Sequence, residues 1–234
     1  MDSLVNVSIV VYISFTFLFF VLKYRFFPEK GYIWILAFVA LSGLIQFFQN
    51  LNLTSSYCGE ADFKLAVYST VVPWIVIFTV FVFALTTLPG WLRVFSNTFG
   101  LFAADAYGLK TVIGQVFQPA NTENKDRSFL NMIDQIYSNK TALVVEMDID
   151  NVIPEGKDTS FRFPALEELI KMNIIQQPLP ELQKKLYDVL LLKENVGYFF
   201  WFLLVGIFCI LVSTNTLLSS TCSPKKSNYS SIFK

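Results

Sequence analysis

Four stretches of the chain have no ionisable side chain, and this feature limits its fold more than any other. They cover residues 4–22, 31–48, 65–88 and 196–218, with lengths of 19, 18, 24 and 23 residues. Because 15% of the 234 residues are charged, these stretches would hold about 13 charges if charge were spread evenly. An α-helix rises about 1.5 Å per residue, so a crossing of the hydrocarbon takes roughly 20 apolar residues. The sequence therefore predicts four transmembrane helices.

Composition narrows the function classes. The chain is 54% hydrophobic and 17% aromatic, its formal net charge is zero, and it has three cysteines and no histidine. A nucleic-acid-binding protein or a disulfide scaffold is a poor match to these values. Without histidine the usual nucleophile triads cannot be built, and the commonest metal ligand is missing. Ion pumps need charged groups inside the membrane, and these spans have none. We expect no enzyme, no cofactor and no metal.

The basic residues near the spans predict the orientation. Four spans place residues 23–30 and 89–195 on one side, and the amino terminus, residues 49–64 and residues 219–234 on the other. Seven basic residues lie near the spans on the first side and four on the second: Lys23, Arg25, Lys30, Arg93, Lys184, Lys185 and Lys193 against Lys64, Lys225, Lys226 and Lys234. This bias favours a cytoplasmic position for residues 89–195. Cys58 and Cys222 then share the lumenal side, where a disulfide is permitted, and are candidates for one.

The segment between the third and fourth spans is soluble in character, with 14 acidic and 11 basic residues in residues 89–195. Its first part, residues 89–119, has apolar residues at steps of three and four, which predicts an amphipathic helix or a broken pair. Its candidate membrane-interface residues are Trp91, Phe95, Phe99 and Phe102, and its candidate helix-packing residues are Gly100, Ala104 and Gly108. The segment either lies at the bilayer, along it or dipping into it, or packs against the protein's own spans.

Residues 120–195 predict a small α+β unit. We expect a helix over 128–137, a strand over 141–149, a helix over 164–172, and a helix from Pro180 that continues into the fourth span. On the strand Glu146, Asp148 and Asp150 would share one face and are weak candidates for a divalent-cation site. A solvated outer strand face explains the same alternation. The predicted fold is thus a mainly α membrane protein: four spans, an interfacial segment and a small α+β extramembrane unit.

Two resemblances bear on function. The four-span layout resembles that of tetraspanins, but residues 89–195 have no cysteine and so lack the Cys-Cys-Gly of the tetraspanin loop. The stretch Leu-Pro-Gly-Trp-Leu-Arg-Val-Phe-Ser-Asn-Thr-Phe-Gly at 88–100 resembles one found in membrane proteins of large icosahedral double-stranded DNA viruses, the nucleocytoplasmic type of algae and amoebae. That resemblance covers 13 residues.

The resemblance implies a structural minor capsid protein in the virion inner membrane, with residues 89–195 on the cytoplasm-derived side that faces the capsid. Its partners would be the bilayer and other capsid or membrane proteins of the particle. A homo-oligomer is compatible with this role, and nucleic acid is not expected as a partner. Two alternatives stay open: a membrane adaptor outside any particle, and a small oligomeric channel.

Overall fold

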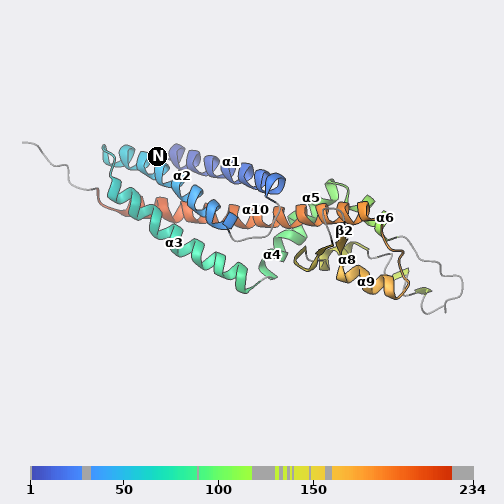
Figure 1. Cartoon of the computed structure of the whole chain (residues 1–234). Helices are drawn as coiled ribbons and strands as arrows, with labels where there is room; N and C mark the ends of the chain where they lie inside the picture. The colour runs from blue at the N-terminus through green and yellow to red at the C-terminus, as the bar shows by residue number, and fades with distance from the viewer. Residues whose placement is uncertain are drawn as a thin grey trace, which may run out of the picture. The chain divides into compact units, whose positions relative to one another are not determined.

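The computed structural model describes residues 2–27, 33–88, 90–117, 130–131, 134–135, 138, 140–147, 149–155 and 160–222. Four of its helices are long and apolar enough to cross a membrane: α1 (Asp2–Phe26), α2 (Ile33–Cys58), α3 (Phe63–Thr87) and α10 (Pro180–Ser219). The four predicted spans are confirmed (Figure 1). Two of the helices extend well beyond the predicted spans. α2 continues ten residues past Phe48, and α10 begins at Pro180, as its sequence predicts.

The chain divides into two compact units, which are described separately. The first unit comprises residues 1–89 and 201–234, and the second comprises residues 90–200. α10 is one uninterrupted helix of 40 residues, and the division falls within it.

In the first unit, α1, α2, α3 and the last part of α10 pack around aromatic rings. Phe38 and Phe202 are fully buried, with ring centroids 5.2 Å apart. Trp74 and Phe78 of α3 stack at 4.6 Å, and Phe78 also stacks on Phe202. Large apolar side chains remain exposed around the outside of the unit, as expected for helices that contact a lipid bilayer.

The second unit is built from short elements around the first part of α10. In chain order they are α4 (Gly90–Phe95), a π-helical turn η1 (Ser96–Gly100), α5 (Leu101–Ala106), α6 (Leu109–Val116), α8 (Lys140–Glu146), a 3-10 turn η2 (Ile149–Asn151), β1 (Ile153–Glu155), β2 (Ser160–Arg162) and α9 (Pro164–Lys171). Its core consists of sixteen buried hydrophobic residues drawn from α5, α6, α8, α9, α10 and the segments between them. α9 confirms the helix predicted to start at Pro164.

The predicted strand over 141–149 is wrong. Lys140–Glu146 forms α8, and the only sheet among the described residues is the antiparallel hairpin of β1 and β2, in which Pro154 lies opposite Phe161. The run Thr-Ala-Leu-Val-Val resembles a strand locally, but as a helix it places Val144 in the core at 0% exposure. Most of the helix predicted over 128–137 lies outside the described residues.

Candidate functional site

The second unit is the candidate docking surface, and its first helical stretch crosses α10 at very short range. Gly100 of η1 lies on the backbone of Lys193, where a Cβ atom on Gly100 would come within 2.1 Å of the Lys193 carbonyl oxygen. One helical turn away, Gly197 lies against Ser96, with 2.8 Å between an added Cβ and the Ser96 Cβ. Only glycine permits this approach, since real Cβ atoms do not come this close to another heavy atom.

The small residues at this crossing are therefore shifted by one turn from the predicted set. Ser96, Gly100 and Ala104 are all buried, at a spacing of four residues. Gly108 does not take part: its φ of 110° ends the helical stretch, and nothing lies within 4 Å of its Cβ position. Gly108 is the break between α5 and α6 that the amphipathic pattern leaves open. The helix-packing ridge thus comprises Ser96, Gly100 and Ala104.

The four candidate interface aromatics lie in α4, η1 and α5. Trp91, Phe99 and Phe102 are exposed, Phe102 by 78%, and Phe95 is partly buried. Phe99 stacks on Phe200 of α10 at 4.1 Å, so this ring also packs within the unit. The π-helical turn inserts an extra residue per turn, which rotates Phe99 toward the side that carries Trp91. An exposed aromatic face therefore exists, while the later positions Leu109, Ile113 and Val116 belong to the core.

The acidic constellation is not assembled as predicted. Glu146 is the last residue of α8 and is exposed, Asp150 belongs to η2, and Asp148 lies outside the described residues. Because the segment is not a strand, the three carboxylates have no shared strand face. Among the described residues no group of three potential ligands is placed to hold a metal ion.

A buried lysine that sequence reasoning did not single out holds α8 in place. Lys193 of α10 is only 5% exposed, and its Nζ donates to the carbonyl oxygens of Val144 (3.0 Å) and Val145 (3.3 Å). These carbonyls belong to the last turn of α8, where the helix dipole is negative and backbone acceptors have no helical partner. A cation is the matching cap for such an end.

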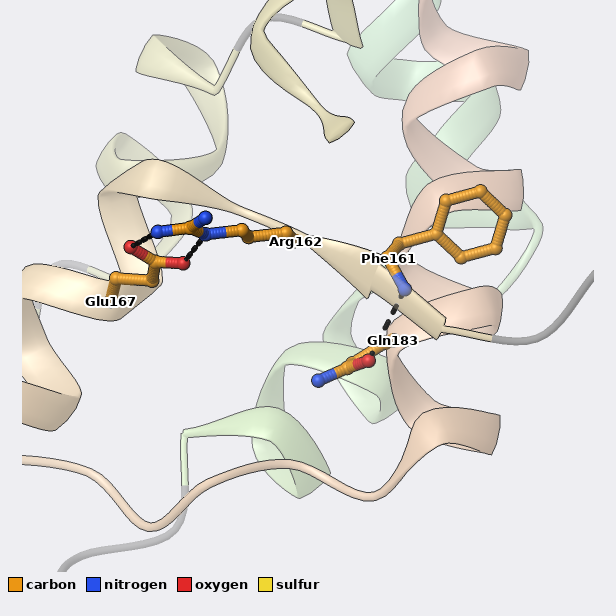
Figure 2. Close-up of polar contacts among 4 residues, drawn as sticks. All are labelled: Phe161, Arg162, Glu167 and Gln183. Carbon is orange, nitrogen blue, oxygen red and sulfur yellow. Dashed lines mark hydrogen bonds and ion pairs between the residues drawn. The ribbon is translucent and has the colours of Figure 1, made fainter. Parts of the chain in front are cut away.

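The hairpin is tied to the two helices beside it. The Arg162 guanidinium of β2 makes two hydrogen bonds to the Glu167 carboxylate of α9, one of them at 2.9 Å (Figure 2). These bonds hold the pKa of Glu167 below its usual range. On the other side the Phe161 backbone N–H donates to Gln183 Oε1 of α10 at 3.3 Å, and the Phe161 ring stacks on Tyr187 at 4.2 Å. The free edge presents Pro154, which has no N–H to pair with another strand.

The exposed surface of this unit is polar and of mixed charge. Its exposed charged side chains lie on most of its helices and on the hairpin: Arg93, Lys110, Glu146, Arg162, Glu168, Lys171, Glu181, Lys184 and Lys185. Such a surface suits contacts made by shape and polar groups more than by apolar burial.

The first unit contains a polar network that the sequence did not reveal. Ser8 Oγ of α1 donates to Gln46 Oε1 (3.0 Å), and Gln46 Nε2 donates to Asn50 Oδ1 (3.0 Å), both in α2. Asn50 Nδ2 donates to Thr70 Oγ1 of α3 (2.7 Å) and to Ser213 Oγ of α10 (2.6 Å). All five residues are buried. The network therefore joins all four helices of the bundle. The available signal was the pair Gln46 and Asn50, four residues apart.

The cysteine pair lies at the end of the bundle nearest this network. Cys58 ends α2, and Cys222 follows α10; the two form a disulfide with a Cα–Cα distance of 5.6 Å. Cys209 is a free, buried thiol within α10. No family model, curated protein or solved structure matches this chain.

Proposed function

We propose that this chain is a non-catalytic structural membrane protein, of the minor capsid type, that anchors a virion inner membrane to the overlying capsid layer. The observation that carries the proposal is α10, which supplies both hydrophobic cores. Leu186, Val189 and Leu190 lie in the core of the second unit, while Phe202 and Ile210 are buried in the first. An anchor has to keep its extramembrane part attached to its spans, and a shared helix does so with no loop at the junction.

The docking face in this proposal is the second unit, with Lys184 and Lys185 at its most accessible basic position. Both are exposed, early in α10, and outside the core residues Leu186 and Val189. The resemblance of residues 88–100 to viral membrane proteins supports the choice of a capsid layer as partner. Trp91, Phe99 and Phe102 would rest at the membrane interface, where large aromatic side chains are favoured.

Two independent observations support an orientation with the second unit on the cytoplasmic side. Disulfides form in oxidising compartments, which would place Cys58 and Cys222 in the lumen. With four spans, residues 89–195 are then cytoplasmic, in agreement with the basic-residue bias. In a particle whose membrane derives from such a compartment, this side faces the capsid.

The channel alternative is weakened by the polar network. A pore needs polar side chains that face a lumen between helices or subunits. Gln46, Asn50 and Thr70 instead bond to one another and are buried within one chain. The membrane-adaptor alternative shares the geometry of the anchor, so purified particles have to distinguish the two.

The first test is the composition of purified particles. An anchor should be present in many copies, stay with the particle through salt washing, and leave it only with detergent. A protein found only in host membranes, or removed by salt alone, would contradict the proposal.

The second test changes the docking face and leaves the spans intact. Lys184→Glu combined with Lys185→Glu should lower the copy number in particles severalfold, while membrane insertion is unchanged. Lys64→Glu is the matched control, because Lys64 is also exposed but lies on the predicted lumenal side. Equal incorporation of the double variant and the control would show that this face of α10 is not used for docking.

A further inference from the structure

An open groove lies between α2 and α3 in the first unit. Its volume is about 740 Å³, and it is lined by apolar residues of both helices. Leu36, Leu44 and Ile75 are exposed at its sides, while Trp74 and Phe78 are buried at its base. A groove of this size is within the range of specific binding sites.

The groove contains an unpaired hydrogen-bond donor. Trp74 is only 4% exposed, and its indole N–H has no hydrogen-bond partner among the described residues. In hydrocarbon no water can take the place of the partner, and each unpaired group costs several kcal/mol. The groove therefore lacks an acceptor near the middle of α3.

A candidate acceptor is exposed on another face of the same unit. Ser14 of α1 is exposed, and its hydroxyl makes no hydrogen bond within the described part of the chain. Exposed apolar residues precede and follow it at steps of three and four, which form one face of the helix: Val7, Val10, Phe17 and Val21. A serine hydroxyl oxygen accepts from an N–H.

The two groups lie at nearly the same depth in the membrane. α1 and α3 run in the same direction, and Ser8 of α1 and Thr70 of α3 belong to one hydrogen-bond network, so they mark a common level. Ser14 is six residues past Ser8, and Trp74 is four residues past Thr70. At about 1.5 Å per residue the two Cα atoms are separated by about 3 Å along the helix axis, which an indole side chain can span.

The groove is open to close approach where it would meet Ser14. Gly43 of α2 lies beside the Trp74 ring, and a Cβ atom added there would still be 4.0 Å from Trp74 Cδ2. Small residues on both sides are typical of helices that pack in membranes, because they let the backbones come near.

We propose that the groove binds α1 of a second copy of this chain, with Trp74 Nε1 donating to Ser14 Oγ of the second copy. The indole N–H is covered in the single chain, so the side chains around it move when the helix seats. The contact joins two different faces of the molecule. Each associated pair therefore has one groove and one α1 still free, and association continues into rings or rows.

The test measures self-association of the purified full chain in phospholipid vesicles by energy transfer between labelled copies, at varied protein-to-lipid ratios. Trp74→Phe and Ser14→Ala should each weaken association by about threefold, the usual effect of one interhelical hydrogen bond. The double variant should be no weaker than either single variant, since both remove the same bond.

Two controls separate this contact from a general effect of the substitutions. Trp91→Phe and Ser55→Ala make the same chemical changes at exposed positions outside the groove and should leave association unchanged. Gly43→Phe fills the groove without touching the fold, because only Trp74 Cδ2 lies within 4 Å of its Cβ position, and it should abolish association.

Cross-linking identifies the two faces directly. A Ser14→Cys chain mixed with a Gly43→Cys chain should form mixed disulfide-linked dimers on oxidation, and a chain with both substitutions should form a ladder beyond dimers. Three outcomes would overturn the proposal. The wild-type chain could stay monomeric at every ratio, as it would if lipid fills the groove. Alternatively, Trp74→Phe and Ser14→Ala could have no effect, or their effects could add.

Discussion

At the residue scale, Asn50 is where the hydrogen bonds of the first unit meet. Its amide makes three of the four bonds in the network, and its partners belong to α2, α3 and α10. In a bundle surrounded by lipid, burial of apolar surface does not favour one helix arrangement over another, because lipid is as apolar as the side chains. Polar bonds between helices therefore have a large share in fixing which faces meet.

Asn50→Ala should lower the free energy of unfolding by about 2 kcal/mol, from three bonds of roughly 0.6 kcal/mol each. The measurement is unfolding in mixed micelles with rising denaturing detergent. Asn215→Ala is the matched control, because Asn215 is an exposed asparagine on α10, and it should have no effect. An equal loss in both variants would mean that the network does not stabilise the bundle.

Gly100→Ala should destabilise the second unit, because the added Cβ would lie 2.1 Å from the Lys193 carbonyl oxygen. The crossing helices would have to separate, and overpacking of this kind costs about 1–3 kcal/mol. Gly114→Ala in α6 is the comparison: nothing lies within 4 Å of its Cβ position, so the variant should be unchanged or up to about 1 kcal/mol more stable. Thermal unfolding of both variants decides the matter, and a neutral Gly100→Ala would contradict the crossing.

At the element scale, the hairpin and α8 are short segments held by contacts from distant parts of the chain. β1 and β2 have three residues each, which is too few for an isolated hairpin to be stable. Arg162, Phe161 and Gln183 connect the hairpin to α9 and α10. α8 has seven residues and depends on the ammonium of Lys193 at its last turn.

The ion pair between β2 and α9 should make stability depend on pH. The pKa of Glu167 is lower in the folded chain than its ordinary value, so the pair stabilises the fold above the unfolded pKa, near 4.5. This contribution is lost as pH falls through the lower, folded pKa. Glu167→Gln should therefore be less stable than the wild type at pH 7 and equal to it in strong acid. Glu168→Gln, at an exposed neighbouring position, should show no such difference. Unfolding curves between pH 7 and 2 provide the measurement.

Lys193→Met should release α8 while the rest of the second unit stays folded. Methionine keeps much of the apolar length of lysine but cannot donate to the Val144 and Val145 carbonyls. Hydrogen exchange should become faster at the backbone amides of residues 140–147 and remain slow in α6. Uniformly faster exchange across the unit would show that Lys193 supports the whole core and not one helix end.

At the scale of the whole molecule, the pattern of charge-free stretches was enough to predict the spans but not their ends. Residues 49–58 of α2 include Asn50, Asn52 and Thr54, which read locally as a polar loop. Their helical structure depends on partners in other helices, such as Thr70 and Ser213, which no local pattern can show. The error at α8 has the same origin, since Lys193 is 49 residues from Val144. The aromatic face was predictable because its spacing is local, whereas the shift of the packing ridge to Ser96 followed from α10.

The proposed orientation predicts where a protease reaches the intact membrane. Protease added on the cytosolic side of sealed vesicles should cut within residues 122–127, which lie outside the described residues and include Lys125 and Arg127. Cleavage at residues 223–226, with 122–127 protected, would reverse the orientation. Vesicles opened with detergent are the control, because both sites then become accessible.

The bond between Cys58 and Cys222 makes the covalent structure of the chain a ring of 164 peptide links with two short tails. One cut anywhere inside that ring opens it without producing a second molecule. A protein nicked between residues 122 and 127 should therefore migrate as a single species on a denaturing gel until reductant is added, and only then separate into two fragments. In a particle, a capsid-facing segment cut once would stay joined to all four spans.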